Sequence, residues 1–133
     1  MARHHHICIQ TDQYAASIDF YTRILGFEII QETPNFHNRY FNTWLKQEDM
    51  LIELQTQRRE ETLTAFEKSS RGIVHFCMLV DDLEAEYKRI RELGFTDFAV
   101  KNGGHIYRVE NGNLLKLHAP EGTIIELRDQ ADI

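Results

Sequence analysis

Four side chains that could bind a divalent metal ion lie within apolar, strand-like segments of this chain. His6 and His75 each open a run of apolar residues, and Glu53 and Glu126 each lie between an isoleucine and a leucine. Imidazole nitrogen and carboxylate oxygen together suit Zn, Ni, Co, Mn or Fe. A carboxylate inside a sheet is costly without a cation or hydrogen-bond donors. These residue types therefore predict a metal site wherever the fold brings them together.

An internal repeat relates the four residues to one another. Three pairs of short segments match in the same order at an offset of about 70 residues: His6–Asp12 with His75–Asp81, Leu25–Phe27 with Leu93–Phe95, and Ile52–Leu54 with Ile125–Leu127. A single strand histidine is more often a core or surface residue, and a single glutamate between apolar neighbours often faces water. Four such residues at equivalent positions of two copies favour the ligand interpretation.

Each copy predicts one strand, one helix and three further strands. The helices are expected to start at or beside Asp12 and Asp82 and to end before Gly26 and Gly94. Strands are expected at 6–11, 27–32, 39–46 and 50–55, and then at 73–80, 96–100 with a continuation over 105–110, 114–119 and 123–128. A short helix is expected at 61–68.

The sequence thus predicts an α+β fold of two tandem βαβββ modules, whose curved mixed sheets enclose a metal-binding cavity. We expect a single domain over residues 1–133, with modules at about 4–55 and 73–128 and a link at 56–72.

Neighbouring histidines and cysteines need separate treatment, because successive strand residues point to opposite faces. His4 shares the predicted face of His6, whereas His5 faces away, and only His6 has a counterpart in the second copy. Cys8 and Cys77 each follow a histidine by two residues; small core residues are favoured over thiolate ligands. Aromatic residues that could line a pocket, or simply fill the core, are Tyr40, Trp44, His105, Tyr107 and His118.

Composition excludes several classes of protein. Fifteen basic against twenty-one acidic residues give a net charge of −6, which argues against a nucleic-acid or anionic-membrane surface. The start of the chain enters an apolar alternation directly, without the pattern of a signal peptide. We therefore expect a cytoplasmic protein that keeps both cysteines reduced.

The combined motifs resemble the vicinal-oxygen-chelate (VOC) superfamily, which includes glyoxalase I, methylmalonyl-CoA epimerase, extradiol dioxygenases and fosfomycin or bleomycin resistance proteins. The first module carries His6–Asp12, Ser17–Tyr21 and Ile24–Phe27, and Ala119–Leu127 is similar to the final hairpin of that superfamily. The glyoxalase I (lactoylglutathione lyase) ligand pattern falls on His6, Glu53, His75 and Glu126. One departure is Gln10, where many glutathione-dependent members carry arginine.

The resemblance implies a metal-dependent lyase or isomerase that moves a proton next to a carbonyl through a metal-stabilised enediolate. A metal-bound carboxylate, either Glu126 or Glu53, would act as the base. We expect one divalent ion per site, Ni or Co in preference to Zn, Mn or Fe, with two waters that the substrate's oxygens replace. The substrate would be a hemithioacetal or an acyl thioester. A homodimer is expected, and the site could form within one chain or across two.

Two other functions are consistent with the same residues. One is an epimerase of the methylmalonyl-CoA type, in which Arg58, Arg59 and Lys101 could hold phosphates, although solvated surface charge is their simpler interpretation. The other is a non-catalytic protein that binds or sequesters a small molecule.

Overall fold

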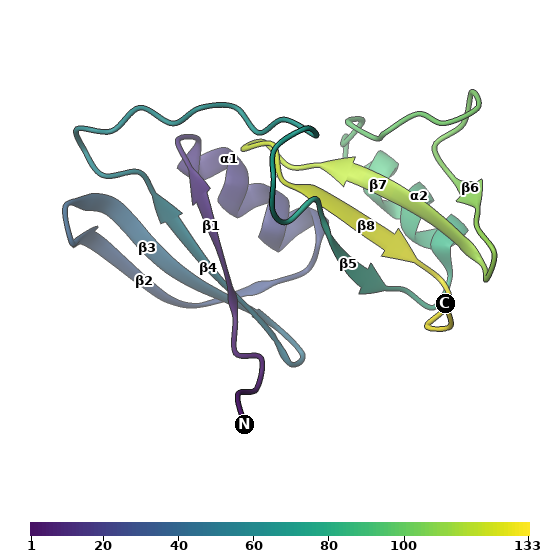
Figure 1. Cartoon of the computed structure of the whole chain (residues 1–133), viewed down its shortest axis with the longest axis horizontal. Helices are drawn as coiled ribbons and strands as arrows, with labels where there is room; N and C mark the ends of the chain where they lie inside the picture. The colour runs from purple at the N-terminus through teal and green to yellow at the C-terminus, as the bar shows by residue number, and fades with distance from the viewer. The chain divides into compact units, whose positions relative to one another are not determined.

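Each half of the chain forms a four-stranded sheet in which the first strand lies beside the last. The computed structural model describes all 133 residues, and they divide into two compact units, Met1–Ala65 and Phe66–Ile133. Figure 1 shows one sheet in each unit, with the helix of that unit against one of its faces. The α+β fold with two βαβββ modules is therefore confirmed.

The first unit follows the predicted order of elements. It contains β1 (Ile7–Thr11), α1 (Tyr14–Asp19), the π-helical turn η1 (Phe20–Ile24), β2 (Glu28–Phe36), β3 (Arg39–Gln47) and β4 (Met50–Thr56). The strands lie in the order β1-β4-β3-β2, and β1 runs parallel to β4 while the other pairs are antiparallel. The sheet is mixed, and β4 is a central strand.

The second unit repeats this topology. It contains β5 (Phe76–Leu79), α2 (Leu83–Glu92), β6 (Tyr107–Arg108), β7 (Asn113–His118) and β8 (Ile124–Arg128). The order is β5-β8-β7-β6, again with a parallel first and last strand. The strand expected at 96–100 is reduced to an isolated bridge at Phe98, and of its continuation over 105–110 only β6 forms. The glycines at 103 and 104 separate the two parts.

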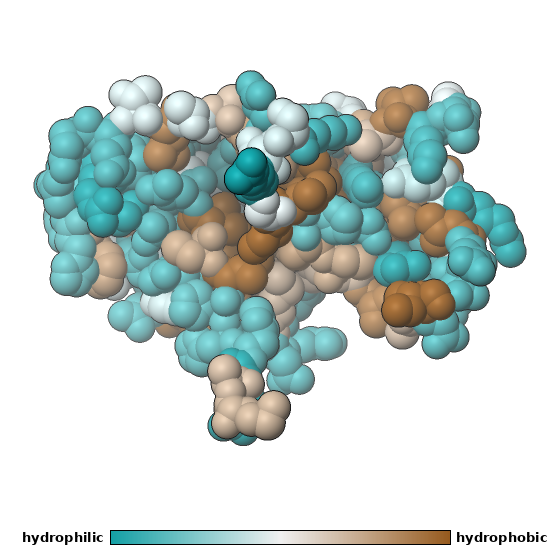
Figure 2. Space-filling model, in the orientation of Figure 1, coloured by the Kyte–Doolittle hydropathy of each residue, from teal (hydrophilic) through white to brown (hydrophobic).

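Alternate strand residues build the core of each unit. In the first unit Leu45, Ile52 and Leu54 are completely buried, together with Tyr21 of η1. In the second unit Leu115, Leu117 and Ile125 take the equivalent role beneath Ile90 of α2. The surface seen in Figure 2 is mostly hydrophilic with separate hydrophobic areas. No helix is long and apolar enough to span a membrane.

The helix ends agree with the sequence. Gly26 and Gly94 follow their helices with φ of +81° and +92°, the left-handed conformation expected of them. Asp82 caps α2 by accepting a hydrogen bond from the Ala85 N–H at 3.0 Å. The first helix likewise starts beside Asp12, as expected: Gln13 is the N-cap of α1, and Thr11 Oγ1 accepts from its backbone N–H.

The short helix expected at 61–68 is absent, and the segment is irregular. Eight residues are too few for a helix without a surface to cover its apolar side, and Phe66 remains 38% exposed.

Candidate metal centre

Each unit brings one predicted histidine to one predicted glutamate. His6 Nε2 lies 3.7 Å from Glu53 Oε1 in the first unit. His75 Nε2 lies 3.2 Å from Glu126 Oε2 in the second. The same imidazole nitrogen faces a carboxylate oxygen in both cases, so the repeat extends to the orientation of the side chains.

The parallel strand pairs explain why these residues meet. Cys8 of β1 registers with Glu53 of β4, and Cys77 of β5 registers with Glu126 of β8. Each histidine lies two residues before the cysteine, on the same strand face. The buried residues on either side of each glutamate point to the opposite face. In each unit the His–Glu pair therefore lies on the face of the sheet that does not carry the core. We call this face the open face of that unit.

Aromatic rings surround His6 in the first unit. Trp44 registers with Glu53 across β3 and β4, and its ring centroid lies 4.8 Å from that of His6. His5, expected to face away, instead places its Nδ1 2.8 Å from the Nδ1 of His6. His5 lies two residues before Ile7, the first residue in strand pairing, and the alternation of faces does not extend that far.

The second unit encloses its pair more tightly. The Glu126 side chain is 9% exposed, against 20% for Glu53, and its one nitrogen partner within 4 Å is the imidazole of His75. The Nδ1 of His75 is buried and has no hydrogen-bond partner. The imidazole of His75 is therefore not fully satisfied by the protein, which is the situation expected where a further group binds.

Both cysteines lie beside the glutamates, but they are exposed residues rather than part of the core, so that prediction is wrong. They belong to the open face, where no helix covers them. Partial burial of the thiols, followed by the effect of the neighbouring Glu53 and Glu126, raises the pKa of Cys8 and of Cys77 to about 11. Each therefore remains a neutral thiol at pH 7.

The ligand atoms of each His–Glu pair, an imidazole nitrogen and a carboxylate oxygen, are of the types that bind a divalent cation. Two atoms that each bind one ion at about 2.1 Å lie about 3.0–3.4 Å apart, close to the separations within the pairs. No cluster of three or more His, Cys, Asp or Glu side chains is arranged to hold a metal ion. Each unit thus offers two ligands, half of the predicted set.

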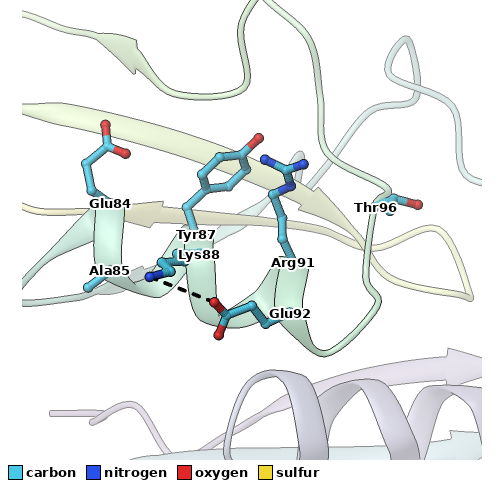
Figure 3. A pocket seen from close by; sticks show the side chains of 7 residues that line it. All are labelled: Glu84, Ala85, Tyr87, Lys88, Arg91, Glu92 and Thr96. Atoms are coloured by element: carbon cyan, nitrogen blue, oxygen red, sulfur yellow. Dashed lines mark ion pairs between the residues drawn. The ribbon is translucent and has the colours of Figure 1, made fainter.

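Most of the aromatic residues that could line a pocket do not adjoin the predicted metal ligands. His105 stacks on Phe98 and bonds to Tyr87, His118 lies 3.0 Å from Asp97, and the rings of Tyr40 and Tyr107 contact cationic side chains. Only Trp44 adjoins a predicted ligand. A separate shallow pocket on α2, lined by Glu84, Tyr87, Arg91 and their neighbours, contains none of the predicted site residues (Figure 3).

One contact at the far end of the open face of the first unit was not predicted from the sequence. Arg39 Nη1 donates to Gln10 Oε1 at 2.9 Å and to the carbonyl oxygen of Thr56 at 2.7 Å. These residues are far apart in the sequence, so only strand pairing brings them together.

Paired βαβββ modules with a His–Glu pair on each open face define a class of small, repeat-built proteins suited to metal binding. The chain belongs to the Glyoxalase/Bleomycin resistance protein/Dioxygenase superfamily, whose family model matches residues 3–112. Members of this superfamily typically use a divalent metal. A search of curated proteins gives no match.

Solved structures share the fold at low sequence identity. A glyoxalase family protein from Enterococcus faecalis is 21% identical with a TM-score of 0.75, covering 96% of this chain and 97% of its own. Lactoylglutathione lyase from Agrobacterium tumefaciens is 19% identical with a TM-score of 0.66, covering 93% and 91%. The fosfomycin resistance protein FosX from Listeria monocytogenes is 14% identical with a TM-score of 0.75, covering 98% and 95%.

Proposed function

We propose that this protein is a metal-dependent lyase or isomerase of the glyoxalase I type, which moves a proton next to a carbonyl group of a small-molecule substrate. The metal ligands are His6, Glu53, His75 and Glu126, contributed within one chain or by two chains of a homodimer. The substrate is a hemithioacetal or an acyl thioester.

The repeated His–Glu pair carries this proposal. A chance ion pair would not recur on the equivalent strands of both units with the same imidazole nitrogen facing the carboxylate. Both ligand types are hard enough for higher coordination, whereas structural zinc sites are built largely from thiolates. The donor set suits Ni or Co.

The protein's own groups have distinct roles in the proposed reaction. The imidazoles of His6 and His75 hold the metal, and the carboxylates of Glu53 and Glu126 are the groups able to accept a proton from the substrate. The indole of Trp44 packs edge-on against His6 and helps to fix the orientation of its imidazole. When bound, a divalent ion supplies Lewis-acid polarisation of the substrate's oxygens.

Metal removal and replacement tests the proposal. The protein is stripped with a chelator, its thermal unfolding is followed, and Ni²⁺, Co²⁺, Zn²⁺ or Mn²⁺ is added back. Activity is assayed on hemithioacetals and, in parallel, on acyl-CoA thioesters. We expect a folded apo-protein that regains isomerase activity with Ni²⁺ or Co²⁺. An apo-protein that is unfolded, and to which zinc restores only the fold, would identify a structural site instead.

Two substitutions separate binding from catalysis. Glu126→Gln and Glu53→Gln are compared with Glu92→Gln on α2, which carries no proposed role. The variant that keeps the metal but loses turnover identifies the base. Equal activity in all three would rule out proton transfer by these carboxylates. A wild-type protein that binds small molecules without stoichiometric metal or turnover would instead be a binding protein.

The contacts of the basic residues lend little support to the acyl-CoA alternative. Arg58 pairs with Glu61 at 3.1 Å, Arg59 lies over the Tyr40 ring, and Lys101 lies over the Tyr107 ring. Each cation thus has a partner in its own chain.

A further inference from the structure

Arg39 is a buried cation without an acidic partner. It is 9% exposed, and its Nη1 donates to two neutral acceptors, Gln10 Oε1 and the Thr56 carbonyl oxygen. A guanidinium remains charged in proteins and has five N–H donors. Neutral acceptors offset only part of the cost of burying such a charge.

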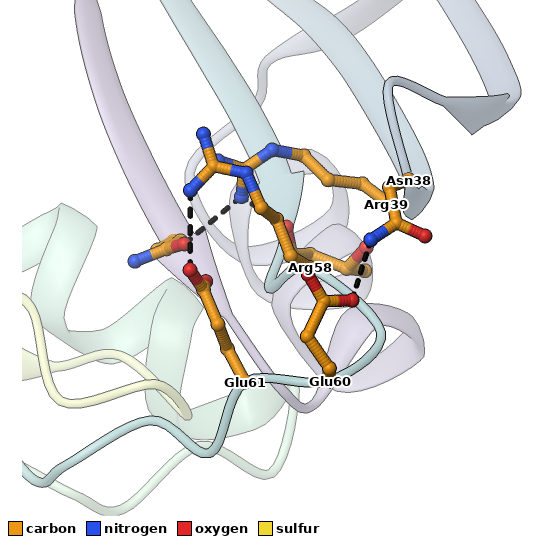
Figure 4. A network of polar contacts seen from close by, with 7 residues as sticks. Asn38, Arg39, Arg58, Glu60 and Glu61 are labelled. Atoms are coloured by element: carbon orange, nitrogen blue, oxygen red, sulfur yellow. Dashed lines mark hydrogen bonds and ion pairs between the residues drawn. The ribbon is translucent and has the colours of Figure 1, made fainter.

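The acidic residues nearby are engaged by other side chains. Figure 4 shows Arg39 with Asn38, Arg58, Glu60 and Glu61. Glu61 accepts from Arg58 at 3.1 Å, and Glu60 accepts from Asn38. No acidic residue of the chain forms an ion pair with Arg39, so the charge of the guanidinium is not neutralised within the protein.

The contact with Gln10 ties this cation to the open face of the first unit. Gln10 lies on the same face of β1 as Cys8 and registers with Gln55 of β4. Gln55 in turn registers with Asn42 of β3, which is 2% exposed and whose Oδ1 has no donor. Arg39 thus leaves an unneutralised cation at this end of the open face.

Strand geometry sets the distance from this cation to the His–Glu pair. Gln55 follows Glu53 by two residues, or about 7 Å along β4, and Gln10 follows His6 by four residues, or about 13 Å along β1. A ligand lying along these strands would reach both ends if its anionic group were separated from its reacting oxygens by a distance in this range.

We propose that Arg39 and Gln10 form a carboxylate-binding subsite, and that the substrate of this protein is an organic carboxylate held there at one end. The substrate assignment rests on the function proposed above; the subsite itself does not. The free edge of the guanidinium, Nε and Nη2, suits bidentate binding of a carboxylate. Gln10 orients the guanidinium through Nη1.

Titration of the metal-free, ¹⁵N-labelled protein tests the subsite directly. The Arg39 Nε–H and Gln10 amide resonances are followed while glutarate, its neutral diamide or inorganic phosphate is added. We expect saturable shifts with glutarate and none with the diamide. Shifts of equal size with the diamide, or none with glutarate, would overturn the proposal, and tighter binding of phosphate would overturn the choice of carboxylate.

Two variants keep the test independent of folding. Arg39→Gln should weaken glutarate binding by about tenfold or more. Gln10→Glu, nearly isosteric, should weaken it similarly while retaining the fold, because it supplies an internal carboxylate to Arg39. The control is Arg23→Gln, since Arg23 is exposed and paired with Asp19 at 2.9 Å; its affinity should match wild type. Unchanged glutarate affinity in a folded Gln10→Glu or Arg39→Gln protein would contradict the subsite.

Parallel Ni²⁺ binding by the same samples separates the two proposals. Absence of Ni²⁺ binding together with normal glutarate shifts would contradict the proposed enzyme function and support the subsite. Normal Ni²⁺ binding without glutarate shifts would contradict only the proposed subsite.

Discussion

The imidazole of His6 meets the indole of Trp44 edge-on, with 4.8 Å between the ring centroids. Trp44 is the only tryptophan of the chain and registers with Glu53, so its emission reports on one His–Glu pair. We predict that Ni²⁺ or Co²⁺ quenches this fluorescence saturably. His6→Ala should abolish most of the quenching, whereas His118→Ala, whose imidazole contacts Asp97, should leave it intact. Equal quenching in both variants would place the metal elsewhere.

Glu126→Gln should affect the metal-free and metal-loaded proteins in opposite ways. The carboxylate is nearly buried with His75 as its only ion-pair partner, so the neutral amide avoids a desolvation cost when no metal is present. We expect the metal-free variant to unfold at or above the wild-type temperature. Its stabilisation by Ni²⁺ should fall from about 3 kcal/mol, the value for a ligand at 100 times its Kd. A large loss of stability without metal would show that the carboxylate serves the fold.

The Tyr14 phenol should make stability depend on alkaline pH. Burial, followed by its hydrogen bond to Glu32, raises the Tyr14 pKa from 10.0 to about 12. A raised pKa contributes stability that is fully present below pH 10 and lost as the pH rises through 12. Tyr14→Phe should therefore show a smaller fall in unfolding free energy between these pH values. Urea denaturation over this range measures it, and Tyr40→Phe at an exposed ring is the control.

Two glycines with the same φ of +92° should tolerate alanine differently. At Gly94 a Cβ would meet nothing within 4 Å, whereas at Gly112 it would collide with the Asp129 carboxylate and with Gln130. Both substitutions incur the left-handed cost of about 1–2 kcal/mol. Gly112→Ala should cost more, since it also displaces the Asp129 oxygen that accepts from the Asn113 N–H at 2.8 Å. Chemical denaturation compares the two, and similar losses would refute the steric argument.

Local sequence patterns predicted the strands and the open face well. The alternation around Glu53 places Ile52 and Leu54 on the opposite face, and both are completely buried. The glycine that ends each helix was also predictable, because only one residue type adopts that conformation at little cost. These features depend on neighbours in the sequence.

Features that depend on distant partners were not predictable in this way. The Arg39–Gln10 bond needs the β2–β3 hairpin, with His37 and Asn38 at positive φ, to carry Arg39 back to the end of β1. The exposure of Cys8 likewise depends on which sheet face lacks a helix, which alternation alone does not specify.

The parallel pairing of first and last strands also sets the order of events during synthesis. In each unit the strand that carries the glutamate is both the last to be made and a central strand of its sheet. A nascent chain halted before Ile124 would lack Glu126 and would leave β5 and β7 without the strand between them. A prematurely terminated product would therefore lose the second sheet together with its His–Glu pair.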